Sequence, residues 1–493
     1  MKSEELMEAI GELEDDLLKT SEPAQIHRKR RKWYILAACA LLAAALLWGG
    51  VQIFGRGEVI QSPKAKAAAL GEPEYPPQKQ WEDYYNNQTA NLPDPIYDRW
   101  QKNRGAGEGL GGFFADSILQ LLGEEKVENA VMSPLNIFMA TAMLGEVTGG
   151  ESRQEILNAL GVESPEELRQ KARGVWELCY YDNGKDKIIP ANSIWLSNDW
   201  DYHPETVERL AREYYASVFR GEMGDPEYDK LLQEWLNKNT GGLLTERIRQ
   251  LSFESETALR LVSTLFLQTK WAFKPFDPAQ NRELIFHGSE GDRTVTFLHG
   301  DDYTRTYYYG DKFIIIPLAT FQGTIWFFLP DEGVSLQEMM QEEAFNAFLE
   351  NPSSDHYWKY DEAKGAMVPQ TYRGVTAGDF IKINLSIPKL DISGKLDLKE
   401  CLEAMGIRRC LEAGKADLSP LLKESRAYLQ EVSQTSRLIL NEEGITAASY
   451  VDAWYGAALP PQEEIDIVLD RPFFFLITNT GDLPLYAGVV NQP

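Results

Sequence analysis

The alternation of apolar and polar residues predicts both helices and strands over residues 109–493. Apolar residues recur at helical spacing in four segments: 112–122, 134–160, 205–218 and 233–244. Runs of β-branched and aromatic residues bounded by turn residues predict strands at 190–199, 259–271, 312–318 and 324–333. Near the end, 383–407 is typical of strand, turn and helix, and 471–490 of a hairpin turning at 479–482. Because helices dominate early and strands late, we predict an α+β fold with mainly antiparallel sheet.

One stretch near the C-terminus, residues 441–461, has an unusual pattern. It begins acidic, bends at Gly444, continues in small residues and ends in Pro-Pro, which is typical of an exposed connector. From Ile445 onward, however, alternate residues form an uncharged set: Ile445, Ala447, Ser449, Val451, Ala453 and Tyr455. The intervening set carries the only charge, at Asp452. Since strand side chains alternate between two faces, this loop is patterned to become a strand with one buried face.

The N-terminal pattern predicts a membrane anchor. Residues 33–54 carry no charge over 22 positions, and at about 1.5 Å per residue such a helix spans roughly 33 Å, enough for a bilayer core of about 30 Å. The run is longer than a signal-peptide core, and no clear cleavage site follows Trp48, so we favour a retained signal-anchor over a cleaved signal peptide. Five Lys or Arg residues in the block 27–32 place the N-terminus in the cytoplasm and the remainder outside.

Three further segments complete the predicted organisation. Residues 1–32 form an acidic amphipathic segment with a basic end; its first 26 residues are interpreted as a solvated helix, with docking to a cytoplasmic partner as the alternative. Residues 55–108, rich in Pro, Gln, Asn and Ala, are predicted to be an extracytoplasmic linker. Its end contains Gly107-x-Gly109-x-x-Gly112, but no strand precedes this match to a dinucleotide fingerprint. Residues 351–381 have no clear period and are interpreted as a surface insertion.

Composition and the absence of known motifs disfavour several classes of function. A net charge of −26 disfavours nucleic acid, because phosphate binding needs a basic surface. The four Cys residues have neither metal-like spacing nor a disulfide framework, and the five His residues fit no metal motif. The nucleophile, phosphate-loop and kinase motifs are missing from the sequence as well. Nothing positive therefore supports an enzyme, and we expect neither a cofactor nor a metal site.

Six motifs in the correct order make residues 109–493 similar to the serpin family. They are NAVMSPLNIFMATAMLGEVTGGESRQEIL, LVSTLFLQTKWAFKPF, FFLPDEG, LSIPKLDISGKLDLKECLEAMGI, NEEGITAAS and RPFFFLITNTGDLPLYAGVVNQP. The resemblance implies a serpin fold with three mainly antiparallel sheets, about nine helices and an exposed reactive-centre loop, here 442–461. The basic block, the short acidic leader and the lack of disulfides resemble bacterial members.

An inhibitory serpin uses this loop as bait. The resemblance implies that a target serine or cysteine protease forms an acyl-enzyme with the loop, which then inserts into the large sheet and traps the protease. It assigns the hinge to Glu442, Glu443, Gly444, Ile445, Thr446, Ala447 and Ala448. No charge or Pro interrupts the hinge between Gly444 and Val451, which favours an inhibitory loop. Ile445 stands where Thr or Ser is usual, so we expect slower insertion and more hydrolysis of the acyl-enzyme.

Counting along the loop places the reactive bond. Sixteen residues after Glu442 comes Ala458, followed by Leu459, whereas counting back from Pro460-Pro461 gives Ala457. No Lys or Arg lies between Arg437 and Arg471, which disfavours trypsin-like targets. The small residue favours an elastase-like protease. A chymotrypsin-like or subtilisin-like enzyme, or a cysteine protease, is the alternative target.

The resemblance also assigns a region that controls sheet opening. Its members here are Ser133, Pro134, Asn136, Ser263, Trp271 and Gln434. Asn136, Ser263 and Gln434 depart from the usual Ser, Asn and His, and we interpret them as a rearranged hydrogen-bond network, with ordinary buried polar groups as the alternative. Together these features predict a single-pass membrane serpin with an extracellular inhibitory domain. The competing hypothesis is a non-inhibitory serpin that acts as a protease-cleavable sensor or binding module.

Overall fold

A computed structural model of the chain describes most of the region after residue 66. The described residues are 67–85, 94–124, 128–272, 275–302, 307–309, 312–353, 358–361, 366–369, 371–372, 375–377, 382–423, 427–429, 433–445 and 464–493. The predicted acidic segment 1–32 and anchor 33–54 lie outside them. Across the described part of the chain, no helix is long and apolar enough to cross a membrane.

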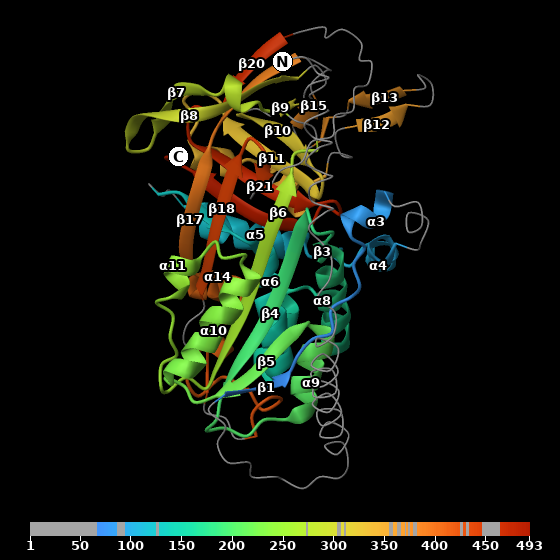
Figure 1. The fold of residues 1–493 in the computed structure, drawn as a ribbon, viewed down its shortest axis with the longest axis vertical. Helices are drawn as coiled ribbons and strands as arrows, with labels where there is room; N and C mark the ends of the chain where they lie inside the picture. Colours follow the sequence, from blue (N-terminus) through green and yellow to red (C-terminus); the bar gives the residue numbers. More distant parts are fainter. Residues whose placement is uncertain are drawn as a thin grey trace, which may run out of the picture. The chain divides into compact units, whose positions relative to one another are not determined.

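Two of the sheets have eight strands each. The one that we call the main sheet runs along the length of the described domain (Figure 1). Its order is β1 (Ala67–Gly71), β5 (Ala216–Gly221), β4 (Lys187–Ser197), β6 (Leu259–Lys270), β19 (Gly444–Ile445), β18 (Ser433–Asn441) and β17 (Leu390–Asp397), with β3 (Tyr181–Asp182) on β4. The pairs are antiparallel except β4 with β5. Because β19 is antiparallel to both neighbours, β6 and β18 run parallel to each other.

Two further sheets and a hairpin complete the β-structure. The second sheet has the order β14 (Thr371–Tyr372), β15 (Val375–Ala377), β9 (Tyr308–Tyr309), β10 (Phe313–Thr320), β11 (Gly323–Pro330), β21 (Phe473–Asn479), β22 (Pro484–Val490) and β2 (Ala130–Met132). The third is β20 (Glu464–Val468), β16 (Lys382–Pro388), β8 (Gly291–Asp302) and β7 (Arg282–Gly288). β12 (Trp358–Asp361) and β13 (Ala366–Pro369) form the hairpin. Three main sheets confirm the predicted fold class, and the 351–381 insertion contains strands, two of which extend the second sheet.

The described residues form twelve α-helices, more than the nine or so expected. They are α3 (Trp81–Tyr85), α4 (Pro95–Asn103), α5 (Gly111–Leu122), α6 (Pro134–Val147), α7 (Gly150–Ala159), α8 (Pro165–Cys179), α9 (Pro204–Glu213), α10 (Pro226–Asn239), α11 (Thr245–Ile248), α12 (Leu336–Met340), α13 (Glu343–Glu350) and α14 (Lys399–Ala404). The surplus comes from short helices and from α3 and α4, which precede the predicted domain. The helix predicted at 205–218 is wrong in its last turn, because the chain leaves α9 at Glu213 and enters β5 at Ala216.

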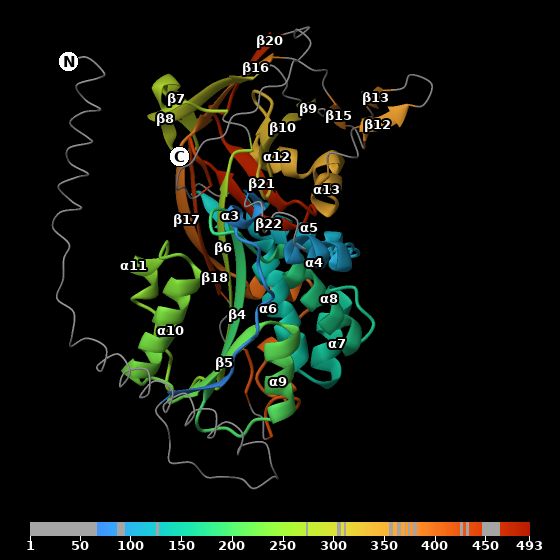
Figure 2. The ribbon, with the colours of Figure 1, turned by 45° about the vertical axis from the view of Figure 1, so that its right-hand side comes forward.

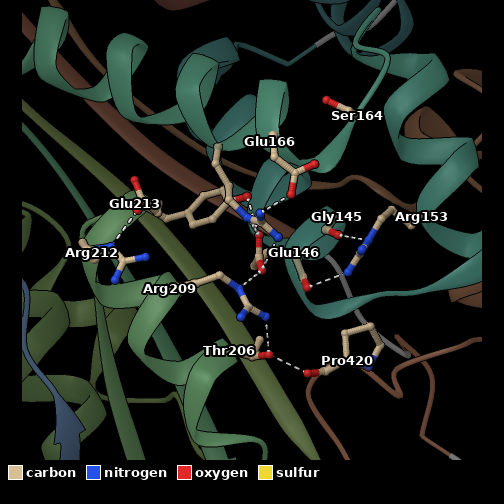
Figure 3. A network of polar contacts seen from close by, with 12 residues as sticks. Gly145, Glu146, Arg153, Ser164, Glu166, Thr206, Arg209, Arg212, Glu213 and Pro420 are labelled. Atoms are coloured by element: carbon tan, nitrogen blue, oxygen red, sulfur yellow. Dashed lines mark hydrogen bonds and ion pairs between the residues drawn. The ribbon is translucent and has the colours of Figure 1, made fainter.

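A buried carboxylate holds three of these helices together on one side of the main sheet. Glu146, at the end of α6, is 1 % exposed and pairs with Arg169 of α8 at 2.7 Å and with Arg209 of α9 at 2.6 Å (Figure 3). The Tyr214 hydroxyl is a third partner and donates at 3.1 Å. Burial alone raises the pKa of the Glu146 carboxyl, but the two guanidinium groups outweigh it and hold the pKa below its ordinary value. The layer beneath the sheet is therefore cross-linked by charge as well as by apolar packing.

Part of the segment predicted to be a tether is instead packed on the domain. Within 55–108, β1 pairs with β5 at the edge of the main sheet, and α4 lies against α8. Arg99 of α4 is only 7 % exposed and donates to the carbonyl oxygens of Glu177, Pro77 and Tyr180. The prediction failed here because the contacts come from the β1 backbone and from isolated side chains such as Tyr75 and Arg99, which give no apolar period. The triple-glycine match follows α4 rather than a strand, so it has no nucleotide-binding context.

Candidate functional site

The first residues of the predicted reactive loop already belong to the main sheet. Gly444 pairs with Asn441 of β18 and with Lys270 of β6, and Ile445 pairs with Leu440 and Thr269. This two-residue strand, β19, is the link between β6 and β18 in the sheet order. The hinge therefore occupies the point where the two halves of the sheet meet.

Backbone geometry explains why glycine stands at the start of this strand. Gly444 has a φ of 141°, a conformation that side-chain-bearing residues rarely adopt. A Cβ placed there would lie 2.3 Å from the Thr269 carbonyl oxygen and 2.7 Å from the Lys270 Cα. The hinge backbone thus fits between β6 and β18 only without a side chain.

Ile445 is buried in this arrangement, with 1 % of its surface exposed. The sequence suggested that its bulk would slow entry into the sheet. In the structure its side chain has already joined the main apolar core beside Leu440. Ile445 is therefore already paired with both strands in this structure, and burying an isoleucine contributes about 1.5–3 kcal/mol to keeping it there.

Polar contacts fix the turn that leads into the hinge. The Glu442 carboxylate pairs with the Lys389 ammonium group and accepts from the Asn281 side chain. Burial raises the pKa of this carboxyl, but the bonds from Lys389 and Asn281 outweigh it and hold the pKa below its ordinary value of 4.5. Sequence reasoning missed both partners; Lys389 lies in the quoted IPKL motif, and Asn281 offers no sequence signal.

Trp271 supports the same turn from the end of β6. Its indole Nε1 donates to the Asn441 carbonyl oxygen at 3.0 Å, and its backbone N–H donates to the Glu443 carbonyl oxygen at 3.3 Å. The ring is 4 % exposed and packs edge-on against Phe276. A buried carboxylate that sequence reasoning missed, Asp186, accepts from the Lys270 N–H at 3.1 Å on the other side of β6.

The structure brings five of the six predicted sheet-opening residues together beneath the seam, the boundary between β6 and β18; the sixth, Trp271, lies apart at the end of β6. Gln434 of β18 makes two 2.9 Å bonds to the Ser133 backbone, one to its N–H and one to its carbonyl. Ser263 of β6 donates to the Asn136 Oδ1 at 3.3 Å. Ser133 also caps α6 by accepting from the Asn136 N–H, and Pro134 occupies the first turn. One helix N-terminus therefore contacts both β6 and β18, the strands on either side of the seam.

The rest of the predicted site falls outside the described residues. Thr446, Ala447 and Ala448 of the hinge, and the reactive-bond candidates Ala457, Ala458 and Leu459, are among them. The next described element is β20, in which Glu464 is opposite Lys382 of β16 in the ladder. Within the described ranges, no group of three or more His, Cys, Asp or Glu side chains is placed to hold a metal ion.

The arrangement is suited to accepting a strand. Among the described residues, β6 and β18 join through β19 alone in the sheet order, and no described strand pairs with them at the ladder positions that follow Ile445. The buried side chains of the two strands follow the same alternation. On β6 they are Leu267 and Leu265, and on β18 they are Leu438 and Ser436. A chain continuing from Ile445 meets both strands in a fixed register.

A family model described as serpin, a serine protease inhibitor, matches residues 111–493. The chain belongs to the serpin family. Plasminogen activator inhibitor 1 of Bos taurus is 24% identical over 389 residues, covering 76% of this chain and 89% of the bovine protein. Alpha-1-antiproteinase of Rattus norvegicus is also 24% identical, over 397 residues, covering 78% and 88% of the two chains.

Solved structures show the same fold. The native-state crystal structure of tengpin, a thermophilic serpin, superposes with a TM-score of 0.65 at 20% identity and covers 87% of this serpin and 100% of tengpin. Serpin48 of Tenebrio molitor gives a TM-score of 0.61 at 19% identity, covering 80% and 98% of the two chains. At these identities the superpositions establish the fold of the domain that carries the hinge.

Proposed function

We propose that this serpin is an inhibitor, not an enzyme, and that it traps its target protease by inserting the cleaved reactive loop between β6 and β18. The observation that carries the proposal is β19. Two loop residues already pair with both strands, so insertion needs only to extend a ladder that exists. Each further residue gains two sets of ladder hydrogen bonds and buries apolar surface on alternate positions.

The loop sequence supports the proposal when the observed register is continued. Counting on from Ile445, Ala447 meets Leu438 and Leu267, and Ser449 meets Ser436 and Leu265. The loop residues on this inward side are uncharged, whereas Asp452 falls on the outward side. Insertion therefore buries no unpaired charge, which would cost several kcal/mol.

We further propose that Ala458 is the residue before the reactive bond and that the target is an elastase-like serine protease. Support comes from the spacing from Glu442 and from the small residues at 456–458. The test is incubation with elastase, followed by denaturing electrophoresis and N-terminal sequencing of the released fragment. We expect a complex that survives SDS and a fragment beginning at Leu459; complete cleavage without a complex would contradict inhibition.

A substitution at the proposed reactive residue sharpens that test. Ala458→Arg supplies the cation that trypsin-like proteases bind, so the complex should form with trypsin and be lost with elastase. Gly456→Arg introduces the same charge two residues away and serves as the control. If Ala458→Arg leaves the preference for elastase unchanged, the reactive bond lies elsewhere in the loop.

We also propose that residues 33–54 anchor the serpin in the cell membrane with its inhibitory domain outside. The uncharged run and the basic block before it support this topology. After alkaline washing, the full chain should remain with membranes, while a variant lacking residues 33–54 should be released. Protease added to intact cells should remove the domain and leave a short cytoplasmic fragment; a fully protected domain would reverse the topology.

A further inference from the structure

A polar cavity lies on the third sheet. In Figure 2 the strands of this sheet, β7, β8, β16 and β20, lie together at the end of the described domain away from α9. The cavity has a volume of about 590 Å³, enough for a small organic molecule rather than a single water. Its polar lining residues include Asn281, Arg282, His299, Asn384 and Asp466.

The Asn281 amide has a fixed orientation at this cavity. Its Nδ2 donates to the Glu442 carboxylate, in the turn before the hinge. Because a carboxylate only accepts hydrogen bonds, Nδ2 must face Glu442, and the amide oxygen must point elsewhere. That oxygen, Oδ1, is buried and has no hydrogen-bond partner among the described residues. A buried acceptor without a partner is costly, so this side of the cavity favours a ligand that carries a donor.

The Asn384 amide is oriented in the same way by two carboxylates of β20. Its Nδ2 donates to Glu464 at 3.0 Å and to Asp466 at 2.7 Å. Both hydrogens of Nδ2 are therefore used, and Asn384 can offer a ligand only its amide oxygen. Asp466 itself keeps acceptor capacity after it has bound a single N–H. Acceptors from three separate segments of the chain thus line one cavity.

A single arginine adds the opposite charge to this lining. Arg282, the first residue of β7, is exposed, and its side chain has no hydrogen bond or ion pair within the described ranges. A guanidinium group binds a carboxylate through two parallel hydrogen bonds. His299 is buried in the lining, with its Nδ1 3.0 Å from the Ser386 hydroxyl. The cavity therefore combines a group of acceptors with one cation that is available to an anionic group.

We propose that this cavity binds a small basic amino acid, with its cationic end on Asn281, Asn384 and Asp466 and its carboxylate on Arg282. Ammonium and guanidinium groups carry several N–H donors and no acceptor, which matches three acceptors. A net charge of −26 also favours the approach of a cationic group. Bound ligand connects the two ends of the reactive loop, through Asn281 to Glu442 and through Asp466 to β20. The proposal does not depend on loop insertion.

The test is calorimetric titration of the full-length, uncleaved serpin with L-arginine. We expect saturable binding that Asp466→Asn weakens about tenfold or more, because a charge-assisted hydrogen bond is lost. Asp292→Asn is the matched control. It removes the same charge from β8 at a position that contacts His287 and does not line the cavity, and it should bind like wild type. Absence of saturable binding to wild type, or equal binding by the two variants, would overturn the site.

The carboxylate contact is tested with a second ligand, agmatine, which has the guanidinium group of arginine but no carboxylate. Arg282→Met should weaken L-arginine binding about tenfold and leave agmatine binding unchanged. Arg293→Met is the control, because Arg293 pairs with Glu290 and does not line the cavity. Equal losses for the two ligands in Arg282→Met would contradict the assignment of the ligand carboxylate to Arg282.

A variant outside the cavity tests the orientation of Asn281. In Glu442→Gln the new amide can donate as well as accept, so it no longer fixes the Asn281 amide, and L-arginine should bind several-fold more weakly. Glu443→Gln, at the exposed adjacent residue, should bind like wild type. L-Arginine should also slow amide exchange at Trp271, whose N–H donates to the Glu443 carbonyl oxygen. Unchanged exchange at saturating L-arginine would contradict the connection to the hinge. These measurements are decided whether or not the serpin traps a protease.

Discussion

Over the described residues, the two edges of β6 are paired to very different extents. On one edge, β6 pairs with β4 over ten residues, from Lys187 opposite Gln268 to Leu196 opposite Leu259. On the other, its ladder with β19 contains only two pairs. An exposed strand edge is normally a liability that proteins cover. Within the described residues, the rest of this second edge has no ladder partner, and we propose that the adjoining loop supplies one.

The comparison also separates two kinds of stabilisation. The β4 side is supported by aromatic packing from α10, whereas the β18 side is supported by hydrogen bonds: Gln434 to Ser133, Glu442 to Lys389 and Arg437 to Leu243. Both halves contain buried apolar residues, and on the β18 side polar contacts of modest strength add to them. Substitutions on the two sides should therefore have different consequences.

The largest effect is expected from a charge on the inward side of the loop. Continuing the β19 register places Ala447 inward and Ala448 outward. Ala447→Asp would bury an unpaired carboxylate at a cost of several kcal/mol, enough to stall insertion so that the acyl-enzyme is hydrolysed. The measurement is the ratio of SDS-stable complex to cleaved serpin.

Ala448→Asp is the matched control for that change. It introduces the same residue one position later on the outward side, so trapping should stay near wild type. Equal losses in the two variants would show that the loop does not continue in the register of β19.

The next effect concerns the bonds beneath the seam. Gln434→Leu leaves the buried Ser133 N–H unpaired and removes one of the two bonds to the Ser133 carbonyl, which also accepts from the Ile137 N–H. This change should lower the free energy of unfolding by about 1–3 kcal/mol. Thr435→Val, the adjacent residue on the other face of β18, should change it little. Chemical denaturation followed by circular dichroism measures both. A Gln434→Leu protein as stable as Thr435→Val would remove this network from the account.

Asn136 provides a related but smaller test. Its Oδ1 accepts a single bond from Ser263, so Asn136→Ala should lower stability by about 1 kcal/mol and increase polymer formation on heating. Asn136→Asp keeps the acceptor and should retain more of the stability. An unchanged melting curve for Asn136→Ala would contradict the proposed role of this residue in sheet opening.

The hinge glycine gives an effect of similar size that is confined to the hinge. Gly444→Val imposes a side chain at a φ of 141° and against the Thr269 carbonyl, at a cost of about 1–3 kcal/mol. We expect β19 to leave the sheet, with faster amide exchange at Thr269, which is opposite Ile445, and at Trp271, whose N–H donates to the Glu443 carbonyl oxygen. Gly414→Val is the control, because a Cβ there meets open space although its φ of 79° is also positive. Undisturbed exchange in Gly444→Val would show that the hinge tolerates a side chain.

The smallest effect is a pH dependence of the turn before the hinge. The Glu442 pKa is lower in the folded protein than its ordinary value of 4.5, so its contribution is present above that value and is lost as the pH falls through the folded-state pKa. Trp271 fluorescence should therefore shift on acidification below 4.5 in wild type. Glu442→Gln should show the acid-type spectrum already at neutral pH and no further shift. A wild-type shift that persists in Glu442→Gln would assign the titration to another group.

Much of the fold was predictable because its signals are local. Strands such as β10 and β11 are continuous apolar runs, and the β21–β22 hairpin turns where its Asn-Thr-Gly-Asp sequence predicts. The 205–218 pattern misled because Tyr214 and Tyr215, which link α9 to β5, are buried like the first residues of β5, so periodicity does not separate the two elements. Tertiary context decided that boundary.

The site was predictable in its chain order but not in its contacts. Alternation after Ile445 indicated a potential strand, but the burial of Ile445 itself depends on β6, about 175 residues earlier in the chain. The contacts of the Glu442 carboxylate likewise come from Lys389 and Asn281, two residues that are distant in sequence and lie side by side only in the folded chain. Arg99 shows the same limit: its bonds go to backbone carbonyls, which carry no sequence signature.

The most direct test of the account is whether the cut loop lies between β6 and β18 in the register set by β19. Continued from Ile445, that register places Ser449 opposite Ser436 of β18, so Ser449→Cys with Ser436→Cys should form a disulfide. The link should form after loop cleavage and not before, while Ala448→Cys with Ser436→Cys should not form it in either state. A disulfide in the Ala448 pair, or none in the Ser449 pair after cleavage, would contradict the insertion that we propose.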